Sequence, residues 1–225
     1  MPIRRPDLRE ALIRLYSQST AERIYGQLRL SIIPFEQFSQ YLPKSGSILD
    51  MGCGFGYVAN YLSLENGAAG DRYVVGIDPS DSRIRAARRT IGGRRNLEFL
   101  AVDSRELPRT NFAGAVIADV LHHTPHDQHE PILADVYAKL RPGGTLVMRE
   151  TAKKWGFRYL VFNYLLELLL YYGHEKANFR RTSEWKTLLE KVGFRVADVI
   201  PNPPLFPYMT SLFVCVKPDG PHRQT

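Results

Sequence analysis

The residues best suited to chemistry are glycines and carboxylates that follow short apolar runs. Asp50 lies near the end of the first run, and Gly52, Gly54 and Gly56 follow it. Glycine lets the backbone turn tightly and approach a ligand closely. Asp78 ends the next apolar run, where a carboxylate can accept hydrogen bonds from both hydroxyls of a ribose. A strand, a glycine loop, a helix and then an acid therefore predict a nucleotide-type ligand.

Two more carboxylates end later apolar runs. Asp103 follows the third run and Asp119 follows the fourth. Ligands of open α/β sheets bind outside the carboxyl ends of the strands, so these acids and Asp78 favour a ligand rich in hydroxyls and amines. The alternative for each of the three is a structural one, in which the acid caps the helix that follows its strand.

Apolar runs alternate with helical patterns from residue 47 onward. The expected strands are 47–51, 73–77, 97–102, 113–118 and 145–148, and the expected helices are 57–64, 80–91 and 128–140. Continuous apolar strands separated by helices indicate parallel strands covered on both faces. Two later runs, 195–200 and 211–216, are the expected closing hairpin. The fold class is α/β, a doubly wound, Rossmann-like, mostly parallel seven-stranded sheet.

Helical segments flank this core on both sides. In the helical region 6–42, Leu8, Leu12, Leu15 and Tyr16 share one face of a helix. Residues 155–172 are the most apolar stretch of the chain, but polar residues interrupt it, so we do not expect a transmembrane helix.

The last expected helix has recognisable ends. Thr182 is the predicted N-cap, Glu184 lies in the first turn, and Gly193 stops the helix.

Four histidines crowd a short stretch after the fourth strand. His122 and His123 lie at the mouth of this strand, where either can act as a general base near neutral pH. The alternative is a structural or capping role. His126 and His129 complete the group, but no Cys or Glu adds a persuasive ligand, so no metal is expected.

The composition of the chain indicates its expected cellular location and the charge of its expected partners. Its 225 residues carry a net charge of +7, and its two cysteines cannot build a disulfide framework. We therefore expect a reducing, cytoplasmic location, with peripheral contact at the inner membrane surface as a further expectation. The positive charge favours anionic surroundings. Six arginines between residues 83 and 95 are either a phosphate-binding surface or a solvated helix face.

Five ordered motifs resemble those of class I S-adenosylmethionine-dependent methyltransferases. They are Asp50–Gly56, Gly76–Asp78, Val102–Ser104, Asp119–His123 and Leu140–Thr145. The segment Leu121–Pro125 is most similar to small-molecule and quinone or lipid methyltransferases. A dinucleotide-binding fingerprint fits less well, because Tyr57 stands where that fingerprint needs a small residue.

The resemblance implies S-adenosyl-L-methionine as cofactor and S-adenosyl-L-homocysteine as product. It implies that Asp50 orients the glycine loop, Asp78 binds the ribose, Asp103 accepts from the adenine amino group and Asp119 contributes at the methionine end. The full set of implied cofactor residues is Asp50, Gly52, Cys53, Gly54, Gly56, Tyr57, Asp78, Pro79, Asp103, Ser104, Asp119 and Val120.

The resemblance also implies how the chain is divided. We expect one methyltransferase domain over residues 1–225. Its parts are an N-terminal helical lid (1–42), a cofactor-binding core (43–150), an apolar helical insertion after strand 5 (151–182), a C-terminal helix with strands (183–217) and a frayed tail (218–225).

The expected reaction is an in-line displacement of the methyl group onto a small organic, lipophilic or lipid-like acceptor. The candidate acceptor residues are Tyr16, Tyr25, Tyr159, Phe162, Tyr172, His174 and Arg181, and the candidate bases are His122, His123 and Glu150. The expected partners are this acceptor and an anionic membrane surface; nucleic acid is not expected, and the chain is a monomer or a homodimer. The alternatives are an RNA or protein methyltransferase, a nicotinamide-dependent oxidoreductase and a non-catalytic cofactor-binding scaffold.

Overall fold

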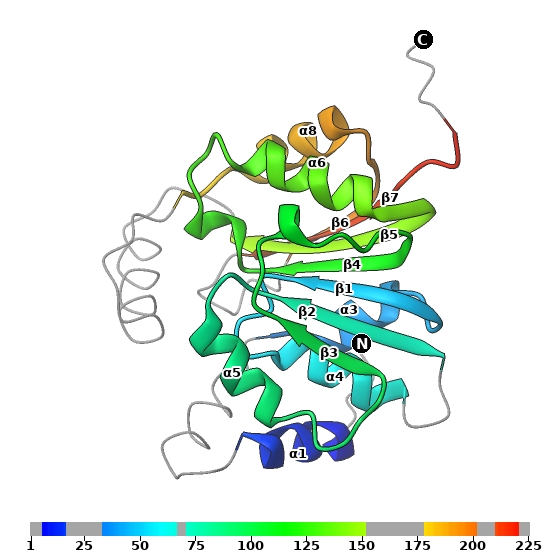
Figure 1. Cartoon of the computed structure of the whole chain (residues 1–225). Coiled ribbons are helices and arrows are strands. Elements are labelled where there is room, and N and C mark those ends of the chain that lie inside the picture. The colour runs from blue at the N-terminus through cyan, green and yellow to red at the C-terminus, as the bar shows by residue number, and fades with distance from the viewer. Residues whose placement is uncertain (1–5, 17–32, 67–70, 152–177, 202–209, 221–225) are drawn as a thin grey trace.

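The computed structural model describes residues 6–16, 33–66, 71–151, 178–201 and 210–220. Their strands form one seven-stranded sheet in the order β3-β2-β1-β4-β5-β7-β6 (Figure 1). The strands are β1 (Gly46–Met51), β2 (Arg72–Ile77), β3 (Leu97–Leu100), β4 (Phe112–Ala118), β5 (Leu140–Thr151), β6 (Arg195–Pro201) and β7 (Thr210–Val216). The pairs among β1 to β5 are parallel, while β7 pairs antiparallel with both β5 and β6. The predicted fold class and closing hairpin are confirmed.

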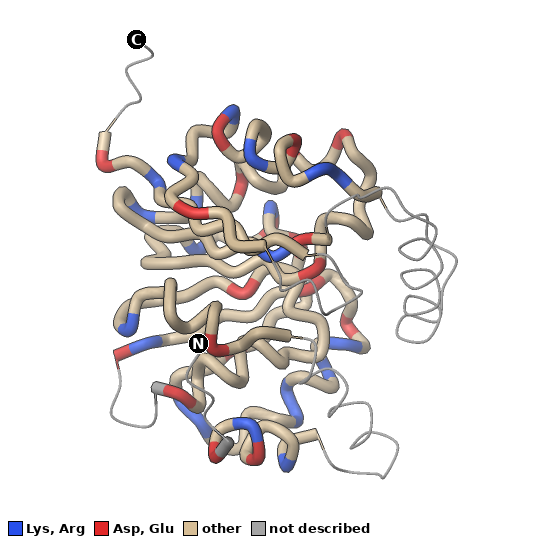
Figure 2. The backbone as a smooth tube through the Cα atoms, turned by 180° about the vertical axis from the view of Figure 1, so that it is seen from behind, with Lys and Arg blue, Asp and Glu red and all other residues tan. Residues whose placement is uncertain are grey.

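Helices cover both faces of the sheet. They are α1 (Pro6–Leu15), α3 (Phe35–Tyr41), α4 (Tyr57–Asn66), α5 (Asp81–Arg89), α6 (His129–Lys139) and α8 (Thr182–Val192), with the short 3-10 helices η1 (Ser104–Glu106) and η2 (Leu121–His123). In Figure 1, α6 and α8 lie on one side of the sheet, and α1, α4 and α5 lie on the other. Charged residues are found mainly on the helices and loops, whereas the central strands are mostly uncharged (Figure 2).

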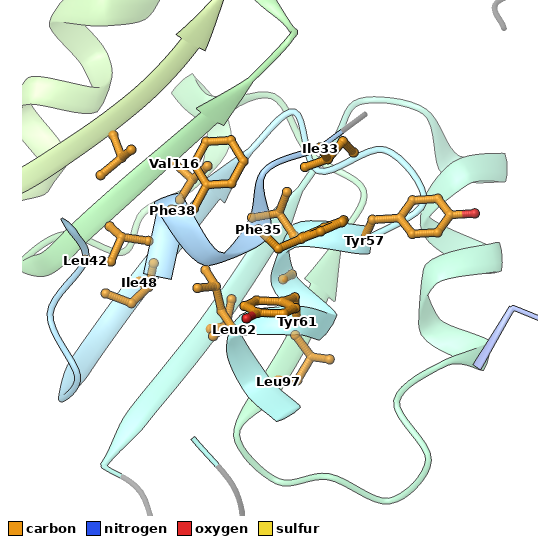
Figure 3. Packing of buried hydrophobic residues seen from close by; sticks show 14 of the residues in the cluster. Ile33, Phe35, Phe38, Leu42, Ile48, Tyr57, Tyr61, Leu62, Leu97 and Val116 are labelled. Carbon is orange, nitrogen blue, oxygen red and sulfur yellow. The ribbon is translucent and has the colours of Figure 1, made fainter. Parts of the chain in front are cut away.

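Alternation along the strands divides the apolar residues into two cores. Ile48 and Leu49 are both fully buried, but they belong to different clusters because successive side chains point to opposite faces. The Ile48 cluster includes Phe35 and Tyr61 from the helices on its face (Figure 3). The Leu49 cluster includes Trp185 of α8. The sheet is therefore buried on both sides, as its continuous apolar strands predict.

Several predicted boundaries were wrong by one to five residues, among them the helix expected over 80–91, which is Asp81–Arg89. β3 ends at Leu100, not at residue 102, because its partner β2 ends at the opposite residue, Ile77. The third helix ends at Lys139, and β5 begins at Leu140, with an irregular register before Thr145.

At α8, Arg181 is the N-cap position and Thr182 is the first helical residue, so the prediction of Thr182 as N-cap was wrong. The Thr182 hydroxyl lies 3.1 Å from the Ser211 hydroxyl, so it forms a hydrogen bond that joins α8 to β7. Gly193 ends α8 with a φ of 114°, as predicted.

Several predicted features fall outside the described residues. These are Tyr25, Tyr159, Phe162, Tyr172, His174 and the whole apolar stretch 155–172. Within the ranges given above, none of the helices has the length and apolar character needed to cross a membrane.

Candidate active site

The loop between β1 and α4 is built from left-handed glycines. Gly52, Gly54 and Gly56 have φ values of 70°, 54° and 82°. A Cβ on Gly52 would stand 2.6 Å from the Val120 side chain, so this glycine lets the loop after β1 touch the loop after β4. A Cβ on Gly56 would stand 2.5 Å from the ring of Phe99. A Cβ on Gly54 would meet nothing within 4 Å, so this part of the loop faces open space.

Asp50 joins the end of β1 to the start of α4 and so fixes the two ends of this loop. It is 2% exposed, and its Oδ2 accepts a hydrogen bond of 3.0 Å from the backbone N–H of Ala59 in the first turn of α4. Asp50 thereby satisfies a helix N–H that Gly56, which has no side chain, cannot cap. Burial raises the pKa of Asp50 to about 7, opposed by the Ala59 hydrogen bond and assisted by the negative charge of Asp78.

Asp78 joins the end of β2 to the same loop. Its Oδ2 accepts from the N–H of Gly54 at 3.0 Å, and its Oδ1 accepts from the N–H of Ser80 at 2.9 Å. The residue is 4% exposed, and the Arg83 guanidinium lies 3.9 Å from Oδ2. The carboxylate therefore has a structural role. Its oxygens have further acceptor capacity, so a ligand hydroxyl is compatible with this role.

Cys53 lies between the loop and β2. Cys53 donates its backbone N–H to Ile77 at 2.9 Å, and its Sγ lies 3.0 Å from where a Cβ on Gly76 would stand. Burial raises the pKa of the Cys53 thiol well above its usual range, and the charges of Asp50 and Asp78 add to the rise. The thiol is therefore a packing group in its protonated form. Pro79 is exposed just beyond Asp78.

Asp103 lies farther along the same edge, after β3. Its Oδ1 accepts from the N–H of Arg105 at 3.0 Å and caps η1, and its backbone N–H donates to Glu106. The Arg105 side chain forms hydrogen bonds with this carboxylate and holds the pKa of Asp103 below its usual range. The Asp103 side chain is 40% exposed, whereas Ser104 is buried. The capping role expected as the alternative for Asp103 is therefore present.

Asp119 follows β4 in a conformation that non-glycine residues rarely adopt. Its φ is 56°, and its backbone N–H donates to the carbonyl of Arg149 at 2.9 Å. Its Oδ2 is bound by the buried Arg149 guanidinium. Its Oδ1 is buried and has no hydrogen-bond partner among the residues that the structure describes. An unpaired buried carboxylate oxygen is costly, and it suits a ligand that brings a donor.

Glu150 holds the chain that follows Asp119. It is fully buried, and its Oε1 accepts from the N–H groups of Val120 at 3.0 Å and Leu121 at 2.7 Å. Its Oε2 lies 2.8 Å from Nδ1 of His122. Burial acts to raise the pKa of Glu150, but attraction to His122 and these hydrogen bonds outweigh it and lower the pKa below its usual range. The carboxylate therefore remains charged and orients His122.

The other histidines have distinct places. His123 stands beside His122, with ring centroids 4.1 Å apart. His129 is buried; its Nδ1 accepts from Arg180 at 2.8 Å, and its Nε2 lies 3.0 Å from the carbonyl oxygen of Thr124. His126 is exposed, with its ring 5.3 Å from that of His129. Among the described ranges there is no His, Cys, Asp and Glu cluster that could hold a metal.

Tyr16 brings the end of α1 to the glycine loop. Its ring stacks on Tyr57 at 4.0 Å, and its hydroxyl donates to the carbonyl of Phe55 at 2.9 Å while accepting from Asn60 at 2.7 Å. Burial raises the pKa of Tyr16 well above its usual value, with the neighbouring Tyr57 adding to it. Phe55 is 38% exposed at the tip of the loop. Three aromatic side chains therefore border the loop.

The structure brings most of the described candidate residues together at one edge of the sheet and leaves Arg181 at a separate place. The structure brings the loop residues, Asp50, Asp78, Asp119 and Val120 together at the carboxyl edge of β1, β2 and β4, with Glu150 and His122 beside them. Arg181 is exposed at the start of α8, where its N–H donates to Glu184. Sequence reasoning missed Arg149 as the partner of Asp119. The available signal was a lone arginine directly after an apolar strand, since a buried cation needs an acid nearby.

A family model described as "Methyltransferase domain" matches residues 48–144. A carboxy-S-adenosyl-L-methionine synthase of Pseudoalteromonas translucida is 26% identical over 118 residues, 51% of this chain and 48% of that protein. A ubiquinone biosynthesis O-methyltransferase of Coxiella burnetii is 27% identical over 162 residues, 69% of this chain and 66% of that protein. A tRNA (carboxymethyluridine(34)-5-O)-methyltransferase of Saccharomyces cerevisiae is 33% identical over 111 residues, 48% of this chain and 36% of that protein. The chain thus spans about half of the first relative's length and 66% of the second's.

Solved structures share the fold. A SAM-dependent methyltransferase from Methanosarcina mazei superposes with a TM-score of 0.67 at 20% identity, covering 83% of this chain and 98% of that one. At this identity the likeness shows the fold alone.

The geometry fits a ligand such as S-adenosylmethionine. This molecule carries a positive sulfonium and an ammonium group, together with ribose hydroxyls and an adenine amino group. The described edge offers carboxylates, an open glycine position at Gly54 and the unpaired Oδ1 of Asp119. These acceptors match the donors and the charge of the ligand.

Substituting the loop glycines separates backbone strain from overpacking. We expect Gly56→Ala to lower the free energy of unfolding by about 2–4 kcal/mol, because a Cβ would have to displace the buried ring of Phe99 in addition to adopting a positive φ. The matched control Gly54→Ala adds only the strain of a positive φ, about 1 kcal/mol. Urea denaturation of the two variants measures both; equal losses would contradict the packing argument.

The buried Asp50 predicts a pH-dependent stability. Its pKa is about 7 in the folded protein, whereas an exposed aspartate loses its proton near a pH of about 4. The folded state then binds more protons than the unfolded state between these values, so stability falls as the pH rises through the window. In urea denaturation, the stability of the native chain relative to Asp50→Asn should decrease from about pH 4 to about pH 7. A difference independent of pH would refute a protonated Asp50.

Proposed function

We propose that the chain is a class I S-adenosylmethionine-dependent methyltransferase and that it methylates a small organic acceptor of lipophilic or lipid-like character. The observation that carries this proposal is the meeting of the glycine loop, Asp78 and Asp119 at one edge of the sheet. These groups can bind the polar ends of one extended ligand.

Each side chain has a proposed task in holding the cofactor, which when bound supplies an electrophilic methyl group on its sulfonium. Asp78 accepts from the ribose hydroxyls while remaining bonded to Gly54, and Asp119 accepts from the amino group of the methionine part. Asp103 and the backbone of Ser104 hold the adenine end. Asp50 acts on the loop, because its carboxyl is buried against Ala59. Alignment and exclusion of water then supply most of the acceleration.

A general base is needed only where the acceptor must lose a proton. We assign this role to His122, whose Nδ1 is fixed by the Glu150 carboxylate. Glu150 itself is a positioning residue in this proposal, because its oxygens are bonded to Val120, Leu121 and His122 inside the protein. A carboxylate that orients an imidazole and stabilises its charged form makes that imidazole a better base.

The lipophilic character of the acceptor is supported by two observations. The ubiquinone biosynthesis O-methyltransferase relative is similar over 69% of this chain. The stretch 155–172 is the most apolar of the sequence, although it lies outside the described residues. Apolar and aromatic residues are the usual lining of pockets for such ligands.

A second candidate acceptor is RNA, favoured by the outer face of α5. Arg83, Arg85, Arg88 and Arg89 are exposed there, and Arg95 is exposed in the loop that follows. Arg85 is paired with Asp81 of the same helix, whereas Arg89 and Arg95 form no ion pair or side-chain hydrogen bond with the residues that the structure describes. The tRNA methyltransferase relative adds support to this candidate. Clustered guanidinium groups bind the phosphates of a nucleic acid whatever its nucleotide sequence.

The cofactor site predicts a contrast between two neighbouring acids. Asp78→Asn should weaken binding of S-adenosylhomocysteine by about 10- to 100-fold, because one acceptor of a charge-assisted hydrogen bond becomes a donor. Asp81→Asn, three residues later on the exposed start of α5, should leave the affinity unchanged. Isothermal titration calorimetry measures both values. Equal affinities for the native chain and Asp78→Asn would remove Asp78 from the site.

The acceptor class is tested by methyl transfer from radiolabelled S-adenosylmethionine into host extract, separated into lipids, soluble small molecules, RNA and protein. Label is expected in the lipid or small-molecule fraction, unchanged in the double variant Arg89→Ala, Arg95→Ala. Label in RNA that is lost in this variant would establish the second candidate instead. No label in any fraction, with S-adenosylhomocysteine still bound, would argue against a catalytic role towards host acceptors.

A further inference from the structure

Residues 178–180 lie along the loop that follows β4 and contact it with successive residues. The backbone N–H of Asn178 donates to the carbonyl of His122 at 2.7 Å. The ring of Phe179 stacks over that of His122, with centroids 5.6 Å apart and an interplanar angle of 23°. Arg180 continues the contact toward α6. We call these three residues, which precede α8 and contact the loop after β4, the return segment.

Arg180 makes the charged contacts of the return segment. Its Nε donates to Nδ1 of His129 at 2.8 Å, and its Nη2 donates to the carbonyl of His126 at 2.9 Å. Its guanidinium carbon also lies 5.7 Å from the ring centre of Trp185. A planar guanidinium can satisfy these directions together, whereas an ammonium group cannot.

These contacts require one protonation state of His129. Arginine has no acceptor, so Nδ1 of His129 must accept and carry no proton. Its Nε2 lies 3.0 Å from the Thr124 carbonyl and must therefore donate. The groups facing this imidazole are Arg180, the ring of His126 at 5.3 Å and, from α8, the ring of Trp185 at 4.8 Å. Burial lowers the pKa of His129 below its usual value, and the charge of Arg180 acts in the same direction.

The return segment is connected to the candidate active site through His122. The same imidazole that packs under Phe179 lies against Oε2 of Glu150, whose Oε1 binds the N–H groups of Val120 and Leu121. Moving the return segment would therefore remove one of the walls that hold the His122 ring.

We propose that Arg180 is a positioning residue, which through neutral His129 clasps the return segment onto the loop after β4 and so fixes His122 beside Glu150. The proposal deepens the proposed methyl transfer and rests on it for its catalytic meaning. Protonation of His129 would place a hydrogen on Nδ1 facing the guanidinium, so the clasp opens under acidic conditions.

The test is nuclear magnetic resonance of the full chain, following imidazole ¹⁵N signals and the hydrogen exchange of the Asn178 amide. In the native chain, His129 should appear as the neutral Nε2–H form at neutral pH. Arg180→Ala should shift the His122 signals and accelerate exchange at Asn178 by about tenfold. Arg180→Lys should restore neither, because it lacks the planar fork.

His129→Asn is the matched control for titration, since an asparagine Oδ1 can accept from Arg180 in place of Nδ1 but has no proton to gain. Slow exchange at Asn178 should then persist into acidic solution, where the native chain loses it. The clasp is overturned if Arg180→Ala leaves both the Asn178 amide and the His122 signals unchanged, or if His129 is charged in the native chain at neutral pH.

A second readout separates the clasp from the proposed function. Arg180→Ala should reduce labelling of the acceptor fraction while leaving the affinity for S-adenosylhomocysteine unchanged. Unchanged labelling would overturn the positioning role. If the native chain transfers no label to any fraction, the proposed function fails, but the exchange of Asn178 still decides whether the clasp exists.

Discussion

A carboxylate without access to water holds the central part of this site in place. Burying the charge of Glu150 is unfavourable unless its oxygens find donors, and here they find the N–H groups of Val120 and Leu121 and the imidazole of His122. The chain after β4 is thereby fixed, including the left-handed turn at Asp119. Val120 can then pack against Gly52, which leaves no room for a side chain there. The position of the glycine loop thus depends on an acid from β5.

Three aspartates of the site region lie at or near the carboxyl ends of strands but differ in environment. Burial raises the pKa of Asp50 to about 7, although its hydrogen bond from the Ala59 N–H at a helix N-terminus acts in the opposite direction, and this aspartate has a structural role. Asp103 is partly exposed and paired with Arg105, so its pKa is lowered and it stays charged. Asp119 is bound by the buried Arg149 on one oxygen only. A strand-end acid is therefore not one kind of group, and its surroundings decide whether it supports the loop or faces the ligand.

Sequence patterns were sufficient to predict the helices and strands, because these elements depend on residues that are close together in the chain. Apolar runs that alternate with helical periods predict the strands and their sequence along the chain, and Asp50, Asp78 and the glycines mark the edge of the sheet where the candidate site lies. Contacts between distant residues were not predictable in this way. The pairs Asp119 with Arg149 and His129 with Arg180 join positions far apart in the chain, and only the sheet order and the packing of α8 on α6 bring them together. The predicted helix ends differ from those of the structure by one or two residues. At α8 the reason is again a distant contact, because the Thr182 hydroxyl lies against the Ser211 hydroxyl of β7 and does not cap its own helix.

The candidate site and the outer face of α5 carry charges of opposite sign. The chain has a net charge of +7, yet the described candidate site is lined by carboxylates and the exposed arginines lie on α5. A ligand with positive sulfonium and ammonium groups is attracted by the first region and repelled by the second. An anionic molecule is attracted by α5 instead. Arg83 stands where the two regions meet, 3.9 Å from Asp78. The arginine face and the carboxylates of the candidate site therefore favour ligands of opposite charge on adjoining surfaces.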